Sequence, residues 1–383
     1  MTPPTRVAVF APYYPPAFRG GGPVRSIAAL VDSAPEGFAP LVLTADRDLG
    51  ETERLPVPAG RWTRRDGAEV YYAALGSPLG YVRALRAVRR RRPALIHLNS
   101  FMNPRLSIAP LLLWRLGFWG RARVLLAPRG EFGDGALSRR ALKKRVYLRL
   151  FRLLGLPRRV VWHSTAPHET ADIRRLWGEG AVIVERENDT LLPATALTPE
   201  PVDGPLRAVF LGRIVEHKGL HLALEALASV TAPVHLGVYG SREDAAYFRR
   251  CEELVRRLPG HVTVTFHGPV SPENVVSTLA PHELLVMPTA GENFGHVIAE
   301  ALSASCVVAV TPHTPWTEVL SEGGGVVLAR EVGAWAHTLQ EQASAAPEDR
   351  LRQRRAAGET YERWRARPRP PHVWVSALDV ELR

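Results

Sequence analysis

The sequence predicts an α/β protein with two doubly wound domains, each built on a parallel β-sheet covered by helices. Three observations predict this fold class. The length of 383 residues suits two or three domains. Short β-branched apolar runs alternate with amphipathic helical segments along most of the chain. The alternation forms two series, and the stretch between them, 191–205, is rich in proline and small or polar residues, which is typical of an interdomain linker.

The first series, residues 1–190, begins with the short buried-strand pattern of 6–11 and the amphipathic helix pattern of 24–34. Further strands are expected at 39–45, 68–74, 94–100, 123–128 and 159–165.

The second series, residues 206–360, shows the same alternation. Strands are expected at 206–212, 233–240, 262–268, 283–288 and 306–311, and helices at 219–230, 245–258, 272–280 and 293–304. In doubly wound sheets, ligands bind at the carboxyl ends of the strands and against helix N-termini, so the loops after these strands are where a site is expected.

The net charge of +11 is unevenly distributed. Residues 1–195 hold 31 Lys/Arg and 16 Asp/Glu, whereas 196–383 hold 18 and 22. The basic half suggests an anionic partner, with an arginine-biased surface as the alternative. Cys251 and Cys306 provide no disulfide framework, and no signal-peptide pattern or apolar run of about 20 residues occurs. A cytoplasmic protein is therefore expected, with peripheral attachment to the inner face of the membrane as an extension.

The segment FLGRIVEHKGL contains the first candidate site. A strand ends at Leu211, and Arg213 and Lys218 precede a helix that should start near Gly219. A lysine at the positive end of a helix dipole is unfavourable unless an anion binds there, and Arg plus Lys suit a diphosphate. The alternative is that Glu216 forms a surface salt bridge with these cations.

The segment TAGENFGHVIAEAL contains the second candidate site. With a helix starting near Asn293, Glu292 and Glu300 would lie eight helical rises, roughly 12 Å, apart. Two carboxylates flanking a helix N-terminus could accept sugar hydroxyls on either side of bound phosphates. The alternative makes Glu292 a capping acid and Glu300 a solvated helix residue.

A glycine run, Gly20 to Gly22, precedes the first helix and permits close backbone approach, although such a run alone is weak evidence. Together the three segments resemble the family 4 glycosyltransferases, whose proline–glycine loop, Gly-Arg…Lys-Gly motif and Glu-x7-Glu motif appear here in the same order over residues 6–330. APRGEFGDGALSRRALKKR resembles a loop and helix of bacterial members that act on saccharides or saccharide-containing natural products.

The resemblance implies a GT-B fold, in which two Rossmann-like domains face a central cleft. Residues 1–190 would take the acceptor and 206–360 the donor nucleotide, while the tail 361–383 would return to the first domain. The implied function is retaining transfer of a sugar from a nucleotide sugar, with UDP favoured over GDP on family frequency, to a saccharide, natural-product or lipid-linked acceptor. No cofactor is implied beyond this co-substrate.

The resemblance also assigns roles to residues. Arg213 and Lys218 would hold the diphosphate, Glu300 the ribose, and Glu292 the donor sugar near the reacting face. Further donor contacts are implied for Gly21, Gly22, Arg129, Gly212, Gly268, Val270, Asn293, Phe294, Gly295 and His296.

The sequence departs from the family pattern at three places. Arg129 stands where a donor-contacting histidine is common, Ser305-Cys306-Val307 replaces Gly-x-Pro, and only Asn188 remains of a Pro-Asn-Gly motif. The second change is expected to alter the turn before the next strand.

No general base is evident, which suits retaining members that are thought to use the leaving phosphate to deprotonate the acceptor. Asp46 and Asp48 are interpreted as loop-capping residues rather than as a metal motif, so no metal is expected.

His97, Asn99 and Asn103 are acceptor-site candidates, with ordinary strand-end polar residues as the alternative. The basic, leucine-striped segment 138–159, whose densest cluster is Arg139, Arg140, Lys143, Lys144 and Arg145, could lie on an acidic membrane or could simply present a solvated basic face.

Three other functions remain open. They are an epimerase or phosphorylase of the same fold, an inactive sugar-nucleotide-binding protein, and a nucleic-acid-binding protein. The last is disfavoured because no nucleic-acid module or interleaved basic–aromatic surface is present.

Overall fold

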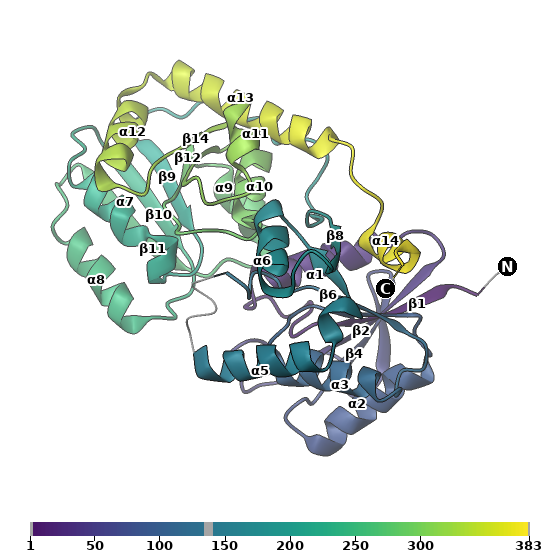
Figure 1. Ribbon diagram of the computed structural model, residues 1–383. Coiled ribbons are helices and arrows are strands. Elements are labelled where there is room, and N and C mark those ends of the chain that lie inside the picture. The colour runs from purple at the N-terminus through teal and green to yellow at the C-terminus, as the bar shows by residue number, and fades with distance from the viewer. Residues whose placement is uncertain (1–2, 134–140, 382–383) are drawn as a thin grey trace. The chain divides into compact units, whose positions relative to one another are not determined.

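The computed structural model describes residues 3–133 and 141–381, with the side chains of 141–143 excepted. Arg139 and Arg140 of the basic cluster, and the side chain of Lys143, therefore lie outside the described part. The chain forms two compact units (Figure 1). The first comprises the chain up to Leu191 together with the residues from Arg369 on, and the second is Leu192–Pro368.

The sheet of the first unit has the strand order β3-β4-β2-β1-β5-β6-β7-β8. All neighbours are parallel except β3 and β4, which form an antiparallel pair at the edge. The strands are β1 (Thr5–Phe10), β2 (Phe38–Ala45), β3 (Trp62–Arg65), β4 (Ala68–Ala73), β5 (Leu95–Leu98), β6 (Arg123–Leu126), β7 (Val161–Ser164) and β8 (Val182–Glu185).

Helices cover both faces of this sheet because the side chains of β1 alternate between two cores. Val7 and Val9 pack toward α1 and α14, whereas Ala8 and Phe10 pack toward α2, α3, α5 and α6. The helices are α1 (Gly22–Asp32), α2 (Pro78–Arg90), α3 (Ala109–Arg115), α5 (Ala141–Leu153), α6 (Pro167–Trp177) and α14 (Val373–Asp379), with short turns at Pro104–Ile108 and Leu156–Arg158. The core on the α1 face is thus completed by a helix from the far end of the sequence.

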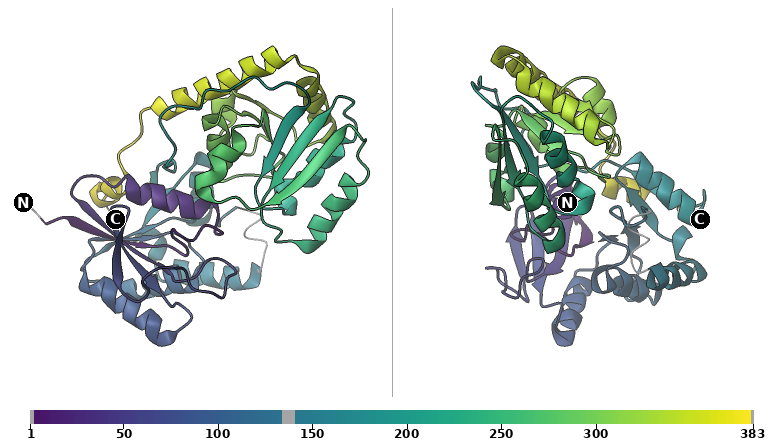
Figure 2. Two further views of the ribbon diagram at one scale, coloured as in Figure 1. Left: turned by 180° about the vertical axis from the view of Figure 1, so that it is seen from behind. Right: turned by 90° about the vertical axis from the view of Figure 1, so that its left-hand side faces the viewer.

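The second unit has a six-stranded, fully parallel sheet in the order β11-β10-β9-β12-β13-β14. Strands of this sheet are drawn in teal and green in Figure 2. Helix α7 packs against α8 and α12, and α10 packs against α9 and α13. The strands are β9 (Leu206–Leu211), β10 (Val234–Tyr239), β11 (Val262–Gly268), β12 (Leu284–Met287), β13 (Val307–Val310) and β14 (Gly325–Val327). The helices are α7 (Leu220–Leu227), α8 (Ala245–Val255), α9 (Val275–Leu279), α10 (His296–Ser303), α11 (Thr317–Ser321), α12 (Val332–Ser344) and α13 (Pro347–Ala366).

The proline-rich stretch at the start of the second unit is held against α13. Arg350 donates from Nη2 to the carbonyls of Val202 at 3.1 Å and Gly204 at 3.0 Å, and Arg354 Nη1 donates to the carbonyl of Glu200 at 2.9 Å. Because α13 continues to Ala366, the division expected at residue 360 falls inside a helix, and the chain rejoins the first unit only at Arg369.

Candidate functional site

The sheet of the second unit reverses its winding at β9, which lies between β10 and β12. The loops after β9 and β12 therefore meet at the carboxyl edge of the sheet, where doubly wound proteins bind ligands. They are joined directly, because the amide of Ala290 donates to the carbonyl of His217 at 2.7 Å. Both sequence motifs of the second unit lie on these two loops.

Two glycines allow the loops at this edge to approach one another. Gly219, with φ of 78°, precedes α7, and a Cβ there would lie 2.1 Å from the carbonyl oxygen of Pro288. A Cβ at Gly240 would lie 1.8 Å from the carbonyl oxygen of Gly212, and the Gly240 amide donates to the carbonyl of Gly268 at 2.8 Å. The loops after β9, β10 and β11 therefore lie side by side, with half-buried Val270 just beyond.

Each cation predicted to hold a diphosphate is paired with a carboxylate. Lys218, on a 3-10 turn before α7, forms an ion pair with Glu292 of the loop after β12, and these side chains are 16% and 12% exposed. Arg213 Nη1 lies 3.2 Å from Glu243 Oε2, in a pair that is half-exposed. Glu292 and Glu243, rather than Glu216, are the partners.

Helix α10 begins at His296, three residues later than expected. Gly295 is its N-cap residue in the left-handed conformation, with φ of 80°, so the chain from Glu292 to Gly295 is not helical and the 12 Å estimate does not apply. The Phe294 side chain is buried, and its carbonyl accepts a hydrogen bond from Trp316 Nε1 at 2.6 Å. In the first turn of α10, the Ile298 amide donates to the carbonyl of Gly295 at 2.9 Å.

Glu300 lies on α10 and is only 5% exposed, so it is not a solvated helix residue. A buried carboxylate is a chemically specific feature, because burying a carboxylate is costly unless polar partners surround it. The described contacts bring Lys218 and Glu292 together, whereas Arg213 is paired with Glu243 and Glu300 lies buried on α10.

Ser305 occupies the turn after α10 where the family pattern has glycine, and it adopts a left-handed conformation with φ of 53°. Its hydroxyl donates to the carbonyl of Leu197 at 2.5 Å, and its own carbonyl accepts from Arg354 Nε at 3.0 Å. Ser305 thus takes the left-handed conformation that glycine adopts most readily. Gly358 makes room, since a Cβ there would lie 2.5 Å from the Ser305 hydroxyl.

In the first unit, the proline–glycine loop after β1 is held by Asp48. This buried carboxylate accepts from the amides of Phe18 at 3.0 Å and Arg19 at 3.2 Å. The interpretation of Asp48 as a loop-capping residue is confirmed. Gly21 then serves as the N-cap residue of α1 with φ of 69°, and Gly22 begins that helix.

Arg129, after β6, is held by two amide side chains. Its Nη1 donates to Asn188 Oδ1 at 2.5 Å and its Nη2 to Asn99 Oδ1 at 2.7 Å. Burial lowers the pKa of Arg129 to about 10, although the nearby Glu169 carboxylate opposes this shift. Arg129 is thus a positioned guanidinium bonded to neutral groups. Its backbone is left-handed, with φ of 54°.

Two carboxylates that the sequence reasoning missed hold the loop carrying Arg129. Glu131 accepts from the Phe101 amide at 2.6 Å and the Met102 amide at 2.8 Å, and burial raises its pKa. Glu169 accepts from the amide of Gly130 at 2.7 Å. Their signal in the sequence was an acid directly after the Pro-Arg-Gly loop and another in the first turn of the helix after β7.

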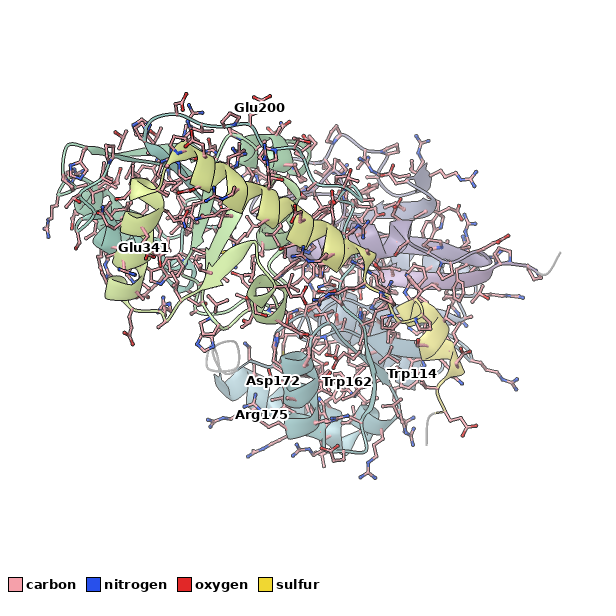
Figure 3. All side chains as sticks on the ribbon, turned by 90° about the horizontal axis from the view of Figure 1, so that it is seen from above. Trp114, Trp162, Asp172, Arg175, Glu200 and Glu341 are labelled. Carbon is pink, nitrogen blue, oxygen red and sulfur yellow. The ribbon has the colours of Figure 1, made fainter. Side chains whose placement is uncertain are left out.

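Helix α6 adds one more tie to this loop. Arg175, which lies near Asp172 on α6 (Figure 3), donates to the carbonyl of Phe132 at 3.0 Å and to Asp172 Oδ1 at 2.6 Å. The loops after β5, β6 and β7 are therefore fastened together at one edge of the first sheet.

The three acceptor candidates are all engaged inside the first unit. His97 is 0% exposed, lies 3.4 Å from His163 and accepts from Trp374 Nε1 at 3.2 Å, and burial lowers its pKa well below the ordinary value. All four residues of β5 are buried, and this burial fits the alternative that His97 is an ordinary strand-end polar residue. Asn99 holds Arg129, as described above, and Asn103 caps the turn that follows it with its amide oxygen.

Among the described residues, no cluster of three or more His, Cys, Asp or Glu side chains is arranged to hold a metal ion. Within the same residues, none of the helices combines the length and apolar character needed to cross a bilayer.

Residues 199–360 match the family model described as glycosyl transferases group 1. A D-inositol 3-phosphate glycosyltransferase of Corynebacterium urealyticum is 31% identical over 139 residues, which cover 34% of this chain and 33% of that protein. A protein of the same name from Xylanimonas cellulosilytica is 30% identical over 161 residues, 41% of this chain and 38% of its own length. The matches thus span little more than a third of these curated relatives.

Solved structures resemble the fold along nearly the whole chain. HepE of Anabaena, in complex with UDP and glucose, has a TM-score of 0.67 at 14% identity and covers 94% of this chain and 95% of its own. Sucrose-phosphate synthase of Thermosynechococcus elongatus has a TM-score of 0.67 at 18% identity and covers 94% and 97%. The fold is GT-B, with two Rossmann-like units, and residues 199–360, within the second unit, are similar to the group 1 glycosyltransferases.

Proposed function

We propose that the protein transfers a sugar from a nucleoside-diphosphate sugar, with UDP favoured over GDP, to a hydroxyl group of a saccharide, natural-product or lipid-linked acceptor. The observation that carries the proposal is the Lys218–Glu292 ion pair, which joins the loops after β9 and β12 at the switch point of the second sheet. Structural neighbours with bound UDP and UDP-glucose support the choice of nucleotide.

In the proposed reaction the donor diphosphate lies against Arg213, Lys218 and the N-terminus of α10. The cations and the helix dipole stabilise the charge that develops as the sugar–phosphate bond breaks. The Glu300 carboxylate accepts hydrogen bonds from the ribose hydroxyls, and the Glu292 carboxylate accepts hydrogen bonds from the hydroxyls of the transferred sugar. The departing phosphate takes the acceptor proton on the same face of the sugar, so configuration is retained, and no metal is needed.

The first unit supplies the acceptor side. Its loops after β5 and β6 present Arg129, which is held by neutral amides and suits an anionic or hydrogen-bonding group. The surface of helix α5 favours contact with acidic lipid. Leu150 and Leu153 are 52% and 82% exposed, and Arg149 and Arg152 beside them are also exposed. Basic and apolar side chains exposed on one helix suit a membrane surface better than a purely solvated face.

The test is incubation with UDP- and GDP-sugars and a panel of glycoside acceptors. The expected product keeps the donor's anomeric configuration by NMR, and its rate is unchanged by EDTA. An inverted linkage, or activity lost with EDTA and restored by Mg²⁺ or Mn²⁺, contradicts the mechanism. Epimerised sugar nucleotide without transfer favours an epimerase, and binding without turnover of any donor favours an inactive sugar-nucleotide-binding protein.

A further inference from the structure

We infer that Glu292 makes the donor site discriminate between a sugar nucleotide and the free nucleoside diphosphate, because Glu292 returns to Lys218 when no sugar is present. This inference rests on the proposed function. It gives Glu292 a second role, in release of the product nucleotide, beyond contact with the transferred sugar.

The geometry places the two groups in one half-buried pair. Lys218 lies on the loop after β9 and Glu292 on the loop after β12, and the amide of Ala290 fastens one loop to the other at His217. The Glu292 amide also donates to the carbonyl of His313 at 2.9 Å, so the backbone that carries this carboxylate is held in place. Both side chains are at most 16% exposed, so neither charge can be satisfied by water alone.

Binding of a complete donor replaces both partners at once. The ammonium of Lys218 exchanges a carboxylate for a phosphate oxygen, and the carboxylate of Glu292 exchanges an ammonium for sugar hydroxyl donors. Binding of the nucleoside diphosphate alone provides a new partner for Lys218 but none for Glu292. The phosphate pairs with the Lys218 ammonium, and the half-buried Glu292 carboxylate then lacks a hydrogen-bond donor. Leaving a half-buried charge without a partner costs free energy.

After transfer, the sugar hydroxyls leave with the product and Glu292 competes with the phosphate for Lys218. The pair therefore weakens the bound product relative to the bound donor. The Arg213–Glu243 pair acts in the same direction but weakly, because it is half-exposed and screened by solvent.

The experiment is calorimetric titration of the full chain with UDP and with GDP. Glu292→Gln should bind the preferred nucleotide at least about fivefold more tightly than the wild type, since the competing charge is gone. Glu216→Gln is the matched control, because it removes the same charge from the exposed acid two residues from Lys218. Its affinity should stay within about twofold.

A double-mutant cycle separates competition for Lys218 from simple repulsion between Glu292 and phosphate. In a Lys218→Met background, Glu292→Gln should no longer tighten nucleotide binding. Tightening that persists there, or no tightening in the single variant, overturns the inference while the proposed function stands. If the wild type binds neither nucleotide and turns over no sugar nucleotide, the inference and the proposed function both fail.

Discussion

At the residue scale, Lys218 and Arg213 differ in how exposed their side chains are, and therefore in how much each is expected to contribute to binding a ligand. Lys218 is mostly buried, whereas Arg213 is half-exposed. Lys218→Ala should weaken binding of the preferred nucleotide at least about tenfold, roughly 1.4 kcal/mol, in calorimetry. Arg213→Ala should weaken it less. Arg250→Ala, on α8 and paired with Glu225, is a control that should bind normally. Unchanged affinity in Lys218→Ala would remove Lys218 from the site.

A second residue-scale prediction concerns His372, which anchors the start of α14. Burial lowers its folded-state pKa to about 4, below the ordinary 6.5, and its Nδ1 accepts from the Trp374 amide at 3.3 Å. Between pH 4 and pH 6.5, His372 is therefore protonated in the unfolded chain but neutral in the folded chain. The stability contributed by neutral His372 is complete above pH 6.5 and is lost as the pH falls toward 4.

Urea unfolding should show about 2–3 kcal/mol of this loss between pH 7 and pH 4.5. In His372→Asn the loss should shrink by that amount, and the remainder should keep the same sign because the pKa values of His97 and His163 are also lowered. A variant whose pH profile matches the wild type would contradict the assignment.

The residue types at the donor site were readable from the sequence, but their pairing was not. Motif spacing identified Lys218 and Glu292, yet only the order of β9 and β12 in the sheet brings them together. In the first unit, the sequence pattern singled out His97 and did not indicate Glu131. A strand-end histidine looks functional in a linear sequence, whereas a carboxylate that accepts from two amides and a hydroxyl of another loop has no local pattern.

At the element scale, Gly219 decides how α7 starts. Alanine there would require φ of 78° for an L-residue and would place its Cβ 2.1 Å from the Pro288 carbonyl. Gly219→Ala should therefore destabilise the second unit by about 2–4 kcal/mol in urea unfolding and weaken nucleotide binding as the loops separate. Gly260→Ala, where the added Cβ meets nothing within 4 Å, should change stability by less than about 1 kcal/mol. Equal stability of the two variants would contradict this account.

Element prediction succeeded where β-branched runs were long and failed where they were short or lay at an edge. β9 and β10 stood out because each has six residues, most of them apolar, with buried positions along the strand. β3, β8 and β14 were missed, since they have at most four residues and are not fully buried. The start of α10 was misplaced because its N-cap residue, Gly295, takes a left-handed conformation with φ of 80°, which helix propensity does not encode.

At the scale of the whole molecule, the charge asymmetry predicts that the basic first half contacts the acceptor or an acidic membrane, while the second half binds the nucleotide. Reversing Arg145 and Arg149 on α5 to Glu should leave nucleotide affinity nearly intact and weaken sedimentation with acidic liposomes, more so at low salt because exposed charges are screened beyond about 10 Å at 0.1 M. The double variant Leu150→Ser, Leu153→Ser should weaken sedimentation with acidic liposomes at every salt concentration. Wild-type liposome binding and acceptor kinetics in both variants would leave α5 as a solvated surface.

The return of α14 to the first unit bears on the order in which the protein can be made. Trp374 and Val373 are fully buried against α1 and the β1 face of the first sheet. The ribosome delivers them only after the entire second unit has been synthesised, which at about 5–20 residues per second is a delay of roughly ten seconds or more after Leu191. During that interval the nascent first unit has an open apolar face. The second unit can therefore reach its native state before the first, against the direction of translation, and the α1 face is where a chaperone would be needed.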